Sequence, residues 1–132
     1  MSRVLVVDDD PAIRSMLVEL LTDEGYETLV AGDGRTAVEI ARLRLPDVIL
    51  MDLMLPVMDG VSATRLIKSS PDTGWIRIIA MSAGANLRLQ VDDLPADGVV
   101  SKPFDLDALL ADVSIQLRQL STPGSSRRSR RE

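Results

Sequence analysis

The chain has 132 residues and a formal net charge of −5, and it contains neither histidine nor cysteine. Disulfides, thiolate metal sites and catalysis by a histidine–nucleophile pair are therefore excluded. The groups that remain for chemistry are carboxylates, hydroxyls, lysine, arginine and the backbone, which suit hard cations and phosphate.

The charge is distributed unevenly along the chain. Residues 121–132 contain four arginines and one glutamate, so the acidic excess lies entirely in residues 1–120. An acidic body argues against nucleic acid as the main ligand. We expect one domain over residues 1–120 and a disordered, Ser- and Arg-rich basic tail over 121–132. That tail is either a solvated end or linker, or a segment that contacts nucleic acid or an acidic surface.

The apolar runs of the sequence are all short. None approaches the ~20 residues that a membrane-spanning helix needs, and no signal-peptide pattern is visible at the N-terminus. We therefore expect a cytoplasmic protein with no membrane contact.

Five short, nearly all-apolar runs alternate with helical patterns. Runs of this kind are typical of strands that are buried on both faces of a parallel sheet. The predicted strands are residues 3–7, 27–31, 47–51, 77–81 and 98–101.

The segments between these strands have helical periodicity. In residues 11–24, apolar side chains recur on one helix face. Asp10 is a suitable N-cap, Pro11 suits the first helical position, and Gly25 suits the position after the C-cap. The other predicted helices are residues 34–44, 60–69, 85–93 and a final helix that begins after Pro103.

Strands that alternate with helices on short loops predict a doubly wound α/β fold with a parallel sheet. In such folds ligands bind beyond the carboxyl ends of the strands. Polar side chains stand at or just beyond those ends. They are Asp8 and Asp9 after the first strand, Asp52 after the third, Ser82 after the fourth and Lys102 after the fifth.

These residue types together favour phosphoryl chemistry. Three neighbouring carboxylates can hold Mg²⁺, and one of them can attack a phosphoryl donor. Lys102 supplies a compact positive charge and Ser82 a hydroxyl donor for the phosphoryl oxygens. Phosphoryl transfer depends mainly on positioning and electrostatics, so the absence of histidine is no obstacle.

The sequence resembles the receiver domain of bacterial two-component response regulators over about residues 2–120. The resemblance rests on four motifs that occur in the right order, each at a strand end. They are VVDDDP at 6–11, PDVILMDLMLPVMDG at 46–60, AMSA at 80–83 and SKPF at 101–104. It implies a flavodoxin-like (βα)5 fold whose five parallel strands lie in the order 2-1-3-4-5.

The resemblance also implies a role for each residue at the strand ends. Asp52 would be the phosphoacceptor. Asp8, Asp9 and Asp52 would bind Mg²⁺, together with the backbone carbonyl of Met54.

Two further residues would act on the phosphoryl group. Ser82 would be the hydroxyl that responds to phosphorylation. Lys102 would contact the phosphate, and the bond between Lys102 and Pro103 is expected to be cis.

The implied function is a phosphorelay switch, not an enzyme acting on a separate substrate. The phosphoryl group would come from a sensor histidine kinase or a histidine phosphotransfer protein. The regulator would catalyse its own phosphorylation and dephosphorylation and would signal through contact with a downstream protein. No helix-turn-helix pattern follows the last helix, so we expect no DNA-binding domain. The family also suggests a homodimer through the fourth helix, fifth strand and fifth helix.

Other interpretations remain at this stage. Val99 occupies a position that is usually aromatic in the family, which leaves open a pseudo-receiver that binds partners constitutively. The stretch from Gly32 to Ala37 matches the GxGxxA dinucleotide fingerprint. Its strand would lie at the sheet edge, however, so a simple helix start is the better interpretation. A small-molecule enzyme on the same fold is disfavoured, because no separate catalytic base is visible.

Overall fold

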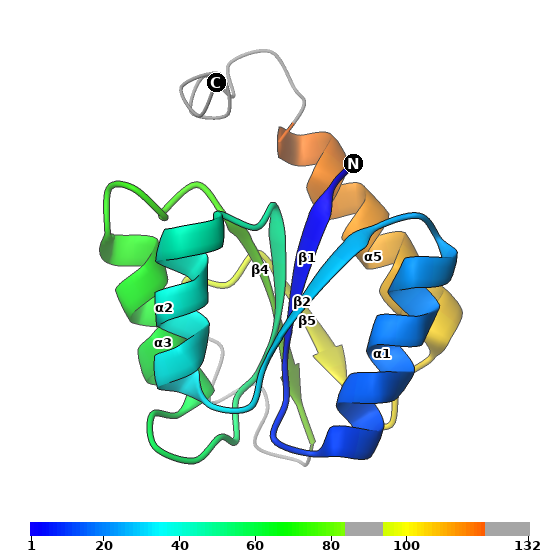
Figure 1. Ribbon diagram of the computed structural model, residues 1–132, viewed down its shortest axis with the longest axis horizontal. Helices are drawn as coiled ribbons and strands as arrows, with labels where there is room; N and C mark the ends of the chain where they lie inside the picture. Colours follow the sequence, from blue (N-terminus) through cyan, green and yellow to red (C-terminus); the bar gives the residue numbers. More distant parts are fainter. Residues whose placement is uncertain (84–93, 121–132) are drawn as a thin grey trace.

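A computed structural model of the chain describes residues 1–83 and 94–120. Strands and helices alternate through residues 3–82, as the sequence predicts, and a further strand and helix lie within residues 94–120 (Figure 1). The elements are β1 (Arg3–Val7), α1 (Pro11–Asp23), β2 (Glu27–Ala31), α2 (Gly34–Arg44), β3 (Val48–Asp52), α3 (Gly60–Ser69), β4 (Arg77–Ser82), β5 (Gly98–Ser101) and α5 (Leu106–Leu120). The helix predicted at 85–93 and the tail at 121–132 lie outside the described residues.

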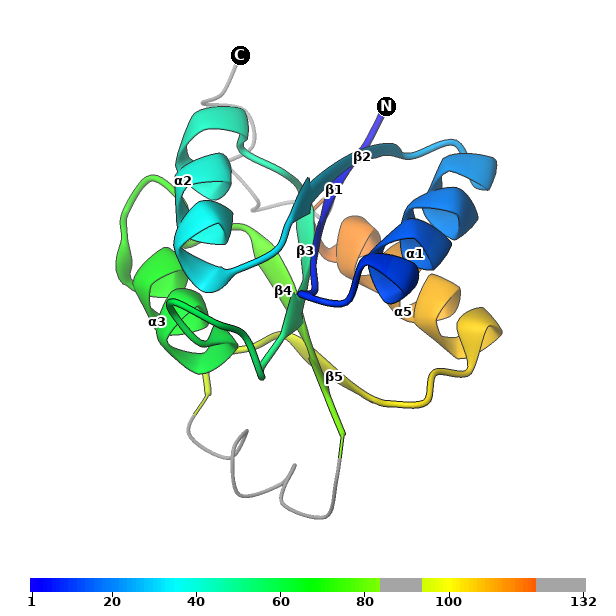
Figure 2. The ribbon, with the colours of Figure 1, turned by 60° about the horizontal axis from the view of Figure 1, so that its bottom comes forward.

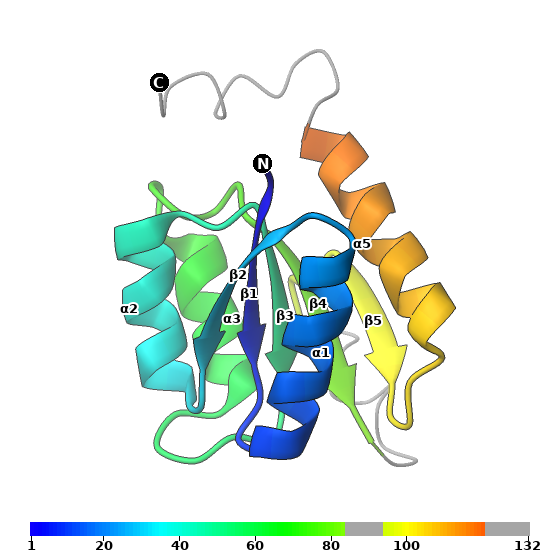
Figure 3. The same ribbon diagram turned by 45° about the vertical axis from the view of Figure 1, so that its right-hand side comes forward.

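The five strands form one parallel sheet in the order β2-β1-β3-β4-β5. Helices α2 and α3 cover one face, and α1 and α5 cover the other (Figures 1 and 3). The predicted doubly wound (βα)5 fold and its strand order are therefore confirmed. Within the described ranges, no helix is both long enough and apolar enough to span a bilayer.

The core consists of two apolar layers, one on each face of the sheet. Alternate residues of β1 supply both layers, since successive side chains of a strand point to opposite faces. Leu5 and Val7 pack under α2 and α3, whereas Val4 and Val6 pack under α1 and α5. This two-sided burial explains why the strands read as continuous apolar runs.

The start and end of α1 follow the sequence signals. The Asp10 carboxylate accepts a hydrogen bond of 2.9 Å from the Ala12 N–H, and Pro11 is the first helical residue. Gly25 has a φ of +91°, the left-handed conformation that glycine adopts most easily after a helix. Asp10 is thus a structural cap.

The glycine motif before α2 has a packing role. The Asp33 carboxylate caps the helix through the Thr36 N–H at 2.8 Å. The Gly34 N–H donates to the Met58 carbonyl at 3.0 Å, and a Cβ on Gly34 would lie only 2.0 Å from that oxygen. The N–H that a dinucleotide phosphate would need is therefore already used, and β2 lies at the edge of the sheet. The helix-start interpretation holds.

The third strand is displaced by one residue from its predicted position. Asp47 precedes β3, where its carboxylate accepts a hydrogen bond of 2.9 Å from the Arg3 N–H. Asp52 is consequently the last residue of β3, paired with Met81 of β4, and does not lie in the following loop. This places the Asp52 backbone in the rigid sheet.

A buried hydroxyl in α3 generates a stability prediction. Thr64 is fully buried, and its hydroxyl has no hydrogen-bond partner within residues 1–83 and 94–120. Thr64→Val should raise the free energy of unfolding by about 1 kcal/mol, because the unsatisfied hydroxyl is replaced by a methyl of similar shape. Urea denaturation measures the change.

Thr64→Ala is the matched control, since it also removes the hydroxyl but leaves a void. It should lower the free energy of unfolding by about 1 kcal/mol. A loss of stability in both variants would show that the hydroxyl makes a favourable interaction.

Candidate functional site

The five polar residues predicted at the strand ends all lie at or just beyond the carboxyl ends of the parallel strands. These strands run in the same direction through the sheet (Figures 2 and 3). Asp8 and Asp9 follow β1, and Asp52 ends the neighbouring strand β3. Ser82 ends β4, and Lys102 follows β5. The parallel arrangement of the strands brings these residues together from distant parts of the chain.

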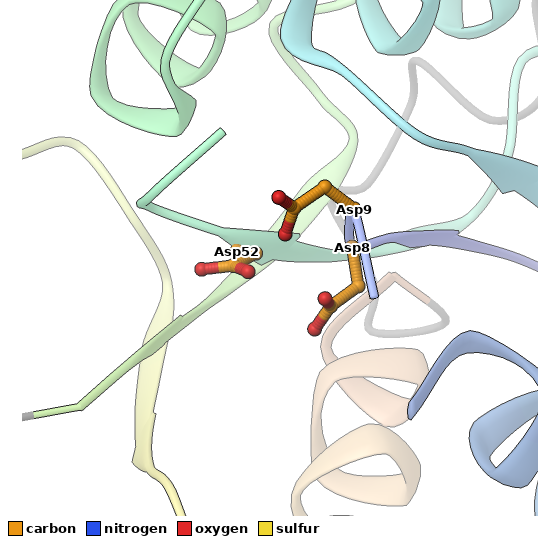
Figure 4. Close-up of side chains that lie close together, drawn as sticks. All are labelled: Asp8, Asp9 and Asp52. Atoms are coloured by element: carbon orange, nitrogen blue, oxygen red, sulfur yellow. The ribbon is translucent and has the colours of Figure 1, made fainter. Parts of the chain in front are cut away.

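Three carboxylates form the centre of this edge. One oxygen from each of Asp8, Asp9 and Asp52 lies within 4.8 Å of the others (Figure 4). Asp8 is fully buried, Asp52 is nearly so, and Asp9 is exposed. Oxygen ligands at this spacing, open to solvent on one side, suit a hard divalent cation such as Mg²⁺ that retains several waters.

The carboxylate of Asp8 is held by the chain around it. The backbone N–H of Asp8 donates to the Ala31 carbonyl at 3.2 Å, which continues the β1–β2 pairing for one residue beyond β1. One carboxylate oxygen accepts from the Asp10 N–H at 2.9 Å. The other accepts from Lys102 at 2.9 Å. Asp8 therefore has a fixed orientation.

Lys102 bridges two of the acids. Its ammonium nitrogen lies 2.9 Å from Asp8 Oδ2 and 3.0 Å from Asp52 Oδ2. The Lys102 N–H also donates to the Ser82 carbonyl at 2.9 Å, which ties the residue to the end of β4. The bond between Lys102 and Pro103 is cis, as predicted.

The loop after Asp52 packs closely around it. The Met54 N–H donates to Asp52 Oδ1 at 3.0 Å, so Met54 lies beside the Asp52 carboxylate. A Cβ on Gly60 would lie 2.0 Å from the Asp52 carbonyl oxygen, so α3 can begin this close to β3 only with glycine at that position. The loop therefore holds both the backbone and one side-chain oxygen of Asp52.

Ser82 is buried at the end of β4. Its hydroxyl donates to the Ala83 carbonyl over a long 3.4 Å. The strand pairing places Ser82 one position beyond Met81, the partner of Asp52 on the adjacent strand. Ser82 therefore lies on the strand next to Asp52, at the same end of the sheet.

The pKa values of both Asp52 and Lys102 are raised, for different reasons. Burial raises the pKa of Asp52 above its ordinary value, although Met54 and Lys102 act to lower it, and Asp8 raises it further. Burial acts to lower the pKa of Lys102, but its hydrogen bonds to Asp8 and Asp52 outweigh this, so the pKa is raised. Lys102 is therefore a permanent cation at neutral pH.

Two contacts at the site were not foreseen from the sequence. Arg14 of α1 donates to the Asp8 carbonyl at 3.0 Å. Lys102 contacts Asp8 as well as Asp52. The position of Arg14 one helical turn after Asp10 was the available signal, because that spacing directs its side chain back toward the start of the helix.

The chain matches the family model of the response regulator receiver domain over residues 4–114. It is 38% identical over 117 residues to the DNA-binding response regulator MtrA of Mycolicibacterium smegmatis. That alignment covers 89% of this chain and 51% of the relative, so the chain spans about half the length of the curated relative it matches.

Solved receiver domains have the same architecture. The receiver domain of a signal transduction histidine kinase from Syntrophus aciditrophicus superposes with a TM-score of 0.88 at 29% identity, covering 95% of this chain and 96% of the other. The receiver domain of the Pseudomonas aeruginosa sensor histidine kinase PA1611 has a magnesium ion coordinated in its active-site cleft. It superposes with a TM-score of 0.78 at 30% identity, covering 88% and 97% of the two chains.

The relatives correct one prediction. The sequence led us to expect partners that are proteins only, with no DNA-binding domain and with a homodimer face around the fourth helix. The prediction of no DNA-binding domain is wrong, because the relative with 38% identity is a DNA-binding response regulator and this chain corresponds to only about half of it. The homodimer face includes the helix predicted at 85–93, which lies outside the described residues. Composition and patterns within 132 residues carry no information about the other half of such relatives.

The bridging lysine yields a prediction about stability. Lys102→Met leaves the Asp8 and Asp52 carboxylates buried without their cation, which should lower the free energy of unfolding by about 3 kcal/mol at neutral pH. The deficit should shrink on acidification. A carboxylate with a raised pKa destabilises the fold fully above that pKa and progressively less as pH falls toward its ordinary 3.8.

Urea denaturation of the variant and the wild type near pH 7 and near pH 5 measures both effects. Adding Asp52→Asn to Lys102→Met should recover most of the lost stability, since only one buried charge remains. A deficit that is the same at both pH values, and is not rescued, would mean that the carboxylates do not cause it.

Proposed function

This chain belongs to the receiver domains of response regulators, and on that premise we propose that it is a phosphorylatable switch of a two-component phosphorelay. The observation that carries the proposal is the cluster of Asp8, Asp9 and Asp52 within 4.8 Å, with the Lys102 ammonium on Asp52. Asp52 is the phosphoacceptor in this proposal, and the donor is a histidine kinase or a histidine phosphotransfer protein.

The residues of the cluster fit Mg²⁺. Asp8, Asp9 and Asp52 would hold it through carboxylate oxygens, with the backbone carbonyl of Met54 as a further ligand. The magnesium site in the related PA1611 receiver domain supports this assignment. When bound, the cation neutralises the clustered acids and the oxygens of the incoming phosphoryl group.

The transfer itself requires a carboxylate nucleophile. A carboxylate oxygen of Asp52 attacks the donor phosphorus, and the phosphorus–nitrogen bond to the donor histidine breaks, with its electron pair remaining on the imidazole nitrogen. The Met54 N–H holds Oδ1 of Asp52, and Lys102 holds Oδ2. Asp52 is therefore oriented before the donor arrives, which reduces the entropic cost of the reaction.

The phosphoryl group then changes the partners of two residues. The Lys102 ammonium, which is positively charged and shared between two acids, forms an ion pair with a phosphoryl oxygen. The Ser82 hydroxyl replaces its long contact to the Ala83 carbonyl with a stronger hydrogen bond to the phosphoryl group. Movement at Ala83 then communicates the state of Asp52 to the chain that follows.

Val99 limits how that change can spread. It is 40% exposed on β5 and is β-branched, so it lacks the reach and rotamer freedom of an aromatic side chain. We therefore assign the response mainly to the segment after Ser82. The same proposal includes a cytoplasmic location and self-catalysed dephosphorylation, both as expected for the family.

A pseudo-receiver is the second candidate, and only Val99 favours it. A constitutive binding module has no need for an acid cluster, a bridging lysine and a strand-end hydroxyl at one edge. Their presence together favours the phosphorylatable switch.

The acceptor can be identified by mass. Incubation with Mg²⁺ and acetyl phosphate should give a phosphoryl adduct on the intact wild-type protein, because the small donor needs only the regulator's own residues. Asp52→Asn should give none. Asp33→Asn, which keeps the α2 cap, should still form the adduct. An adduct that persists in Asp52→Asn would assign another acceptor, and no adduct in the wild type would favour the pseudo-receiver.

Removal of the metal should reveal the contribution of Asp9. Mg²⁺ should raise the thermal midpoint of the wild type, since it binds the folded state alone, and EDTA should reverse the shift. Asp9→Ala should abolish this shift without lowering the metal-free midpoint, because Asp9 is exposed. Differential scanning fluorimetry checks both. An equal Mg²⁺ shift in the wild type and in Asp9→Ala would remove Asp9 from the metal site.

A further inference from the structure

The backbone that carries the metal-site acids is contacted by a side chain from α1. Arg14 is half-buried, and its guanidinium donates to the backbone carbonyl of Asp8 at 3.0 Å. On the N-terminal side, the Asp8 N–H donates to the Ala31 carbonyl of β2 at 3.2 Å. The chain is therefore held on both sides of Asp8 as it leaves β1.

Gly32 provides the space for this contact. A Cβ at that position would lie 3.3 Å from the same guanidinium nitrogen that bonds Asp8. Contacts at that distance are tighter than ordinary van der Waals packing, so even a methyl group at this position would require the guanidinium to shift slightly. The end of β2 thus accommodates the guanidinium against the backbone.

Asp9 depends on this backbone more than its neighbours do. Asp8 and Asp52 have hydrogen-bonded carboxylates, as described above. The Asp9 side chain is exposed, and in the part of the chain that the structure describes it has no hydrogen bond or ion pair. Its direction toward the cluster, seen in Figure 4, is therefore set by the peptide that joins it to Asp8.

From this geometry we propose that Arg14 is a positioning residue for the metal site, because it fixes the peptide plane between Asp8 and Asp9 and so directs the Asp9 carboxylate at the cation. The inference rests on the proposed function in that it takes Asp9 to be a Mg²⁺ ligand. Arg14 contacts neither the cation nor the phosphoryl group in this scheme. Groups that orient metal ligands commonly affect metal affinity by 10- to 100-fold.

The charge of Arg14 and its positioning of Asp9 should have opposite effects on Mg²⁺ affinity. A cation near a Mg²⁺ site repels the metal, so removing its charge would tighten binding if charge were its main effect. If Arg14 acts by positioning Asp9, its removal weakens binding. The sign of the change therefore separates the two effects.

The experiment compares Arg14→Met with Arg35→Met. Arg35 is an exposed residue in the first turn of α2, at the same end of the sheet as the site. Both variants replace arginine with methionine, so both change the net charge equally. Mg²⁺ titration followed by the thermal midpoint should show affinity about tenfold weaker in Arg14→Met. Arg35→Met should bind as the wild type does, or slightly more tightly. Arg14→Lys, which keeps a donor, should recover part of the loss.

Two further measurements keep the proposal separate from a general loss of fold. The Mg²⁺ concentration for half-maximal phosphorylation of Asp52 by acetyl phosphate should rise in Arg14→Met, while the rate at saturating Mg²⁺ stays near that of the wild type. The second measurement is made on metal-free protein by NMR. The three-bond coupling between the amide and α protons of Asp9 should be typical of a single backbone conformation in the wild type and conformationally averaged in Arg14→Met. The same couplings in β1 should be unchanged.

The outcomes separate the two levels of inference. Unchanged or tighter Mg²⁺ binding in Arg14→Met would overturn the positioning role and leave the proposed function intact. A wild type that binds no Mg²⁺ would overturn the proposed function. An unchanged Asp9 coupling in metal-free Arg14→Met would overturn the positioning role whether or not the metal binds.

Discussion

The ammonium of Lys102, placed between the carboxylates of Asp8 and Asp52, is the interaction on which the site depends. The two buried carboxylates, whose oxygens lie within 4.8 Å of each other, repel each other, and neither is fully solvated. One cation offsets both while leaving Asp9 and the solvent side open. The site is consequently stable without metal, yet it retains excess negative charge that a divalent cation can neutralise.

The parallel sheet makes this arrangement available. Its strands end at a common edge, so residues separated by 94 positions in sequence, such as Asp8 and Lys102, meet within hydrogen-bond distance. Glycine at position 60 lets α3 begin against the Asp52 backbone, which closes the loop around Asp52. The backbone that carries the acids is therefore held by the sheet, and in the proposed switch it is the side chains of Lys102 and Ser82 that change partners.

Much of this could be predicted from the sequence, because the controlling signals are local. Buried parallel strands read as apolar runs, and Asp10 and Gly25 have intrinsic preferences for the helix positions that they occupy. The contact of Gly34 with Met58 depends on how separate elements pack, which no local pattern encodes, whereas the contact of Arg14 with Asp8 had a local signal in its spacing from Asp10. The prediction of no DNA-binding domain was wrong for a different reason: this chain covers only about half of its relative, whose other half its own residues do not record.

The contact between Gly34 and Met58 has a mechanical consequence. The loop that follows Asp52 continues into α3 at Gly60, and its Met58 carbonyl accepts a hydrogen bond from the start of α2. Gly34 packs directly against this carbonyl, with no room for a Cβ between them. A displacement of this loop is therefore transmitted to α2, the helix that follows the edge strand β2. Asp52 is thus connected to the end of β4 by strand pairing and to the start of α2 through the Met58 carbonyl, so in the proposed switch a single chemical event alters two surfaces of the molecule.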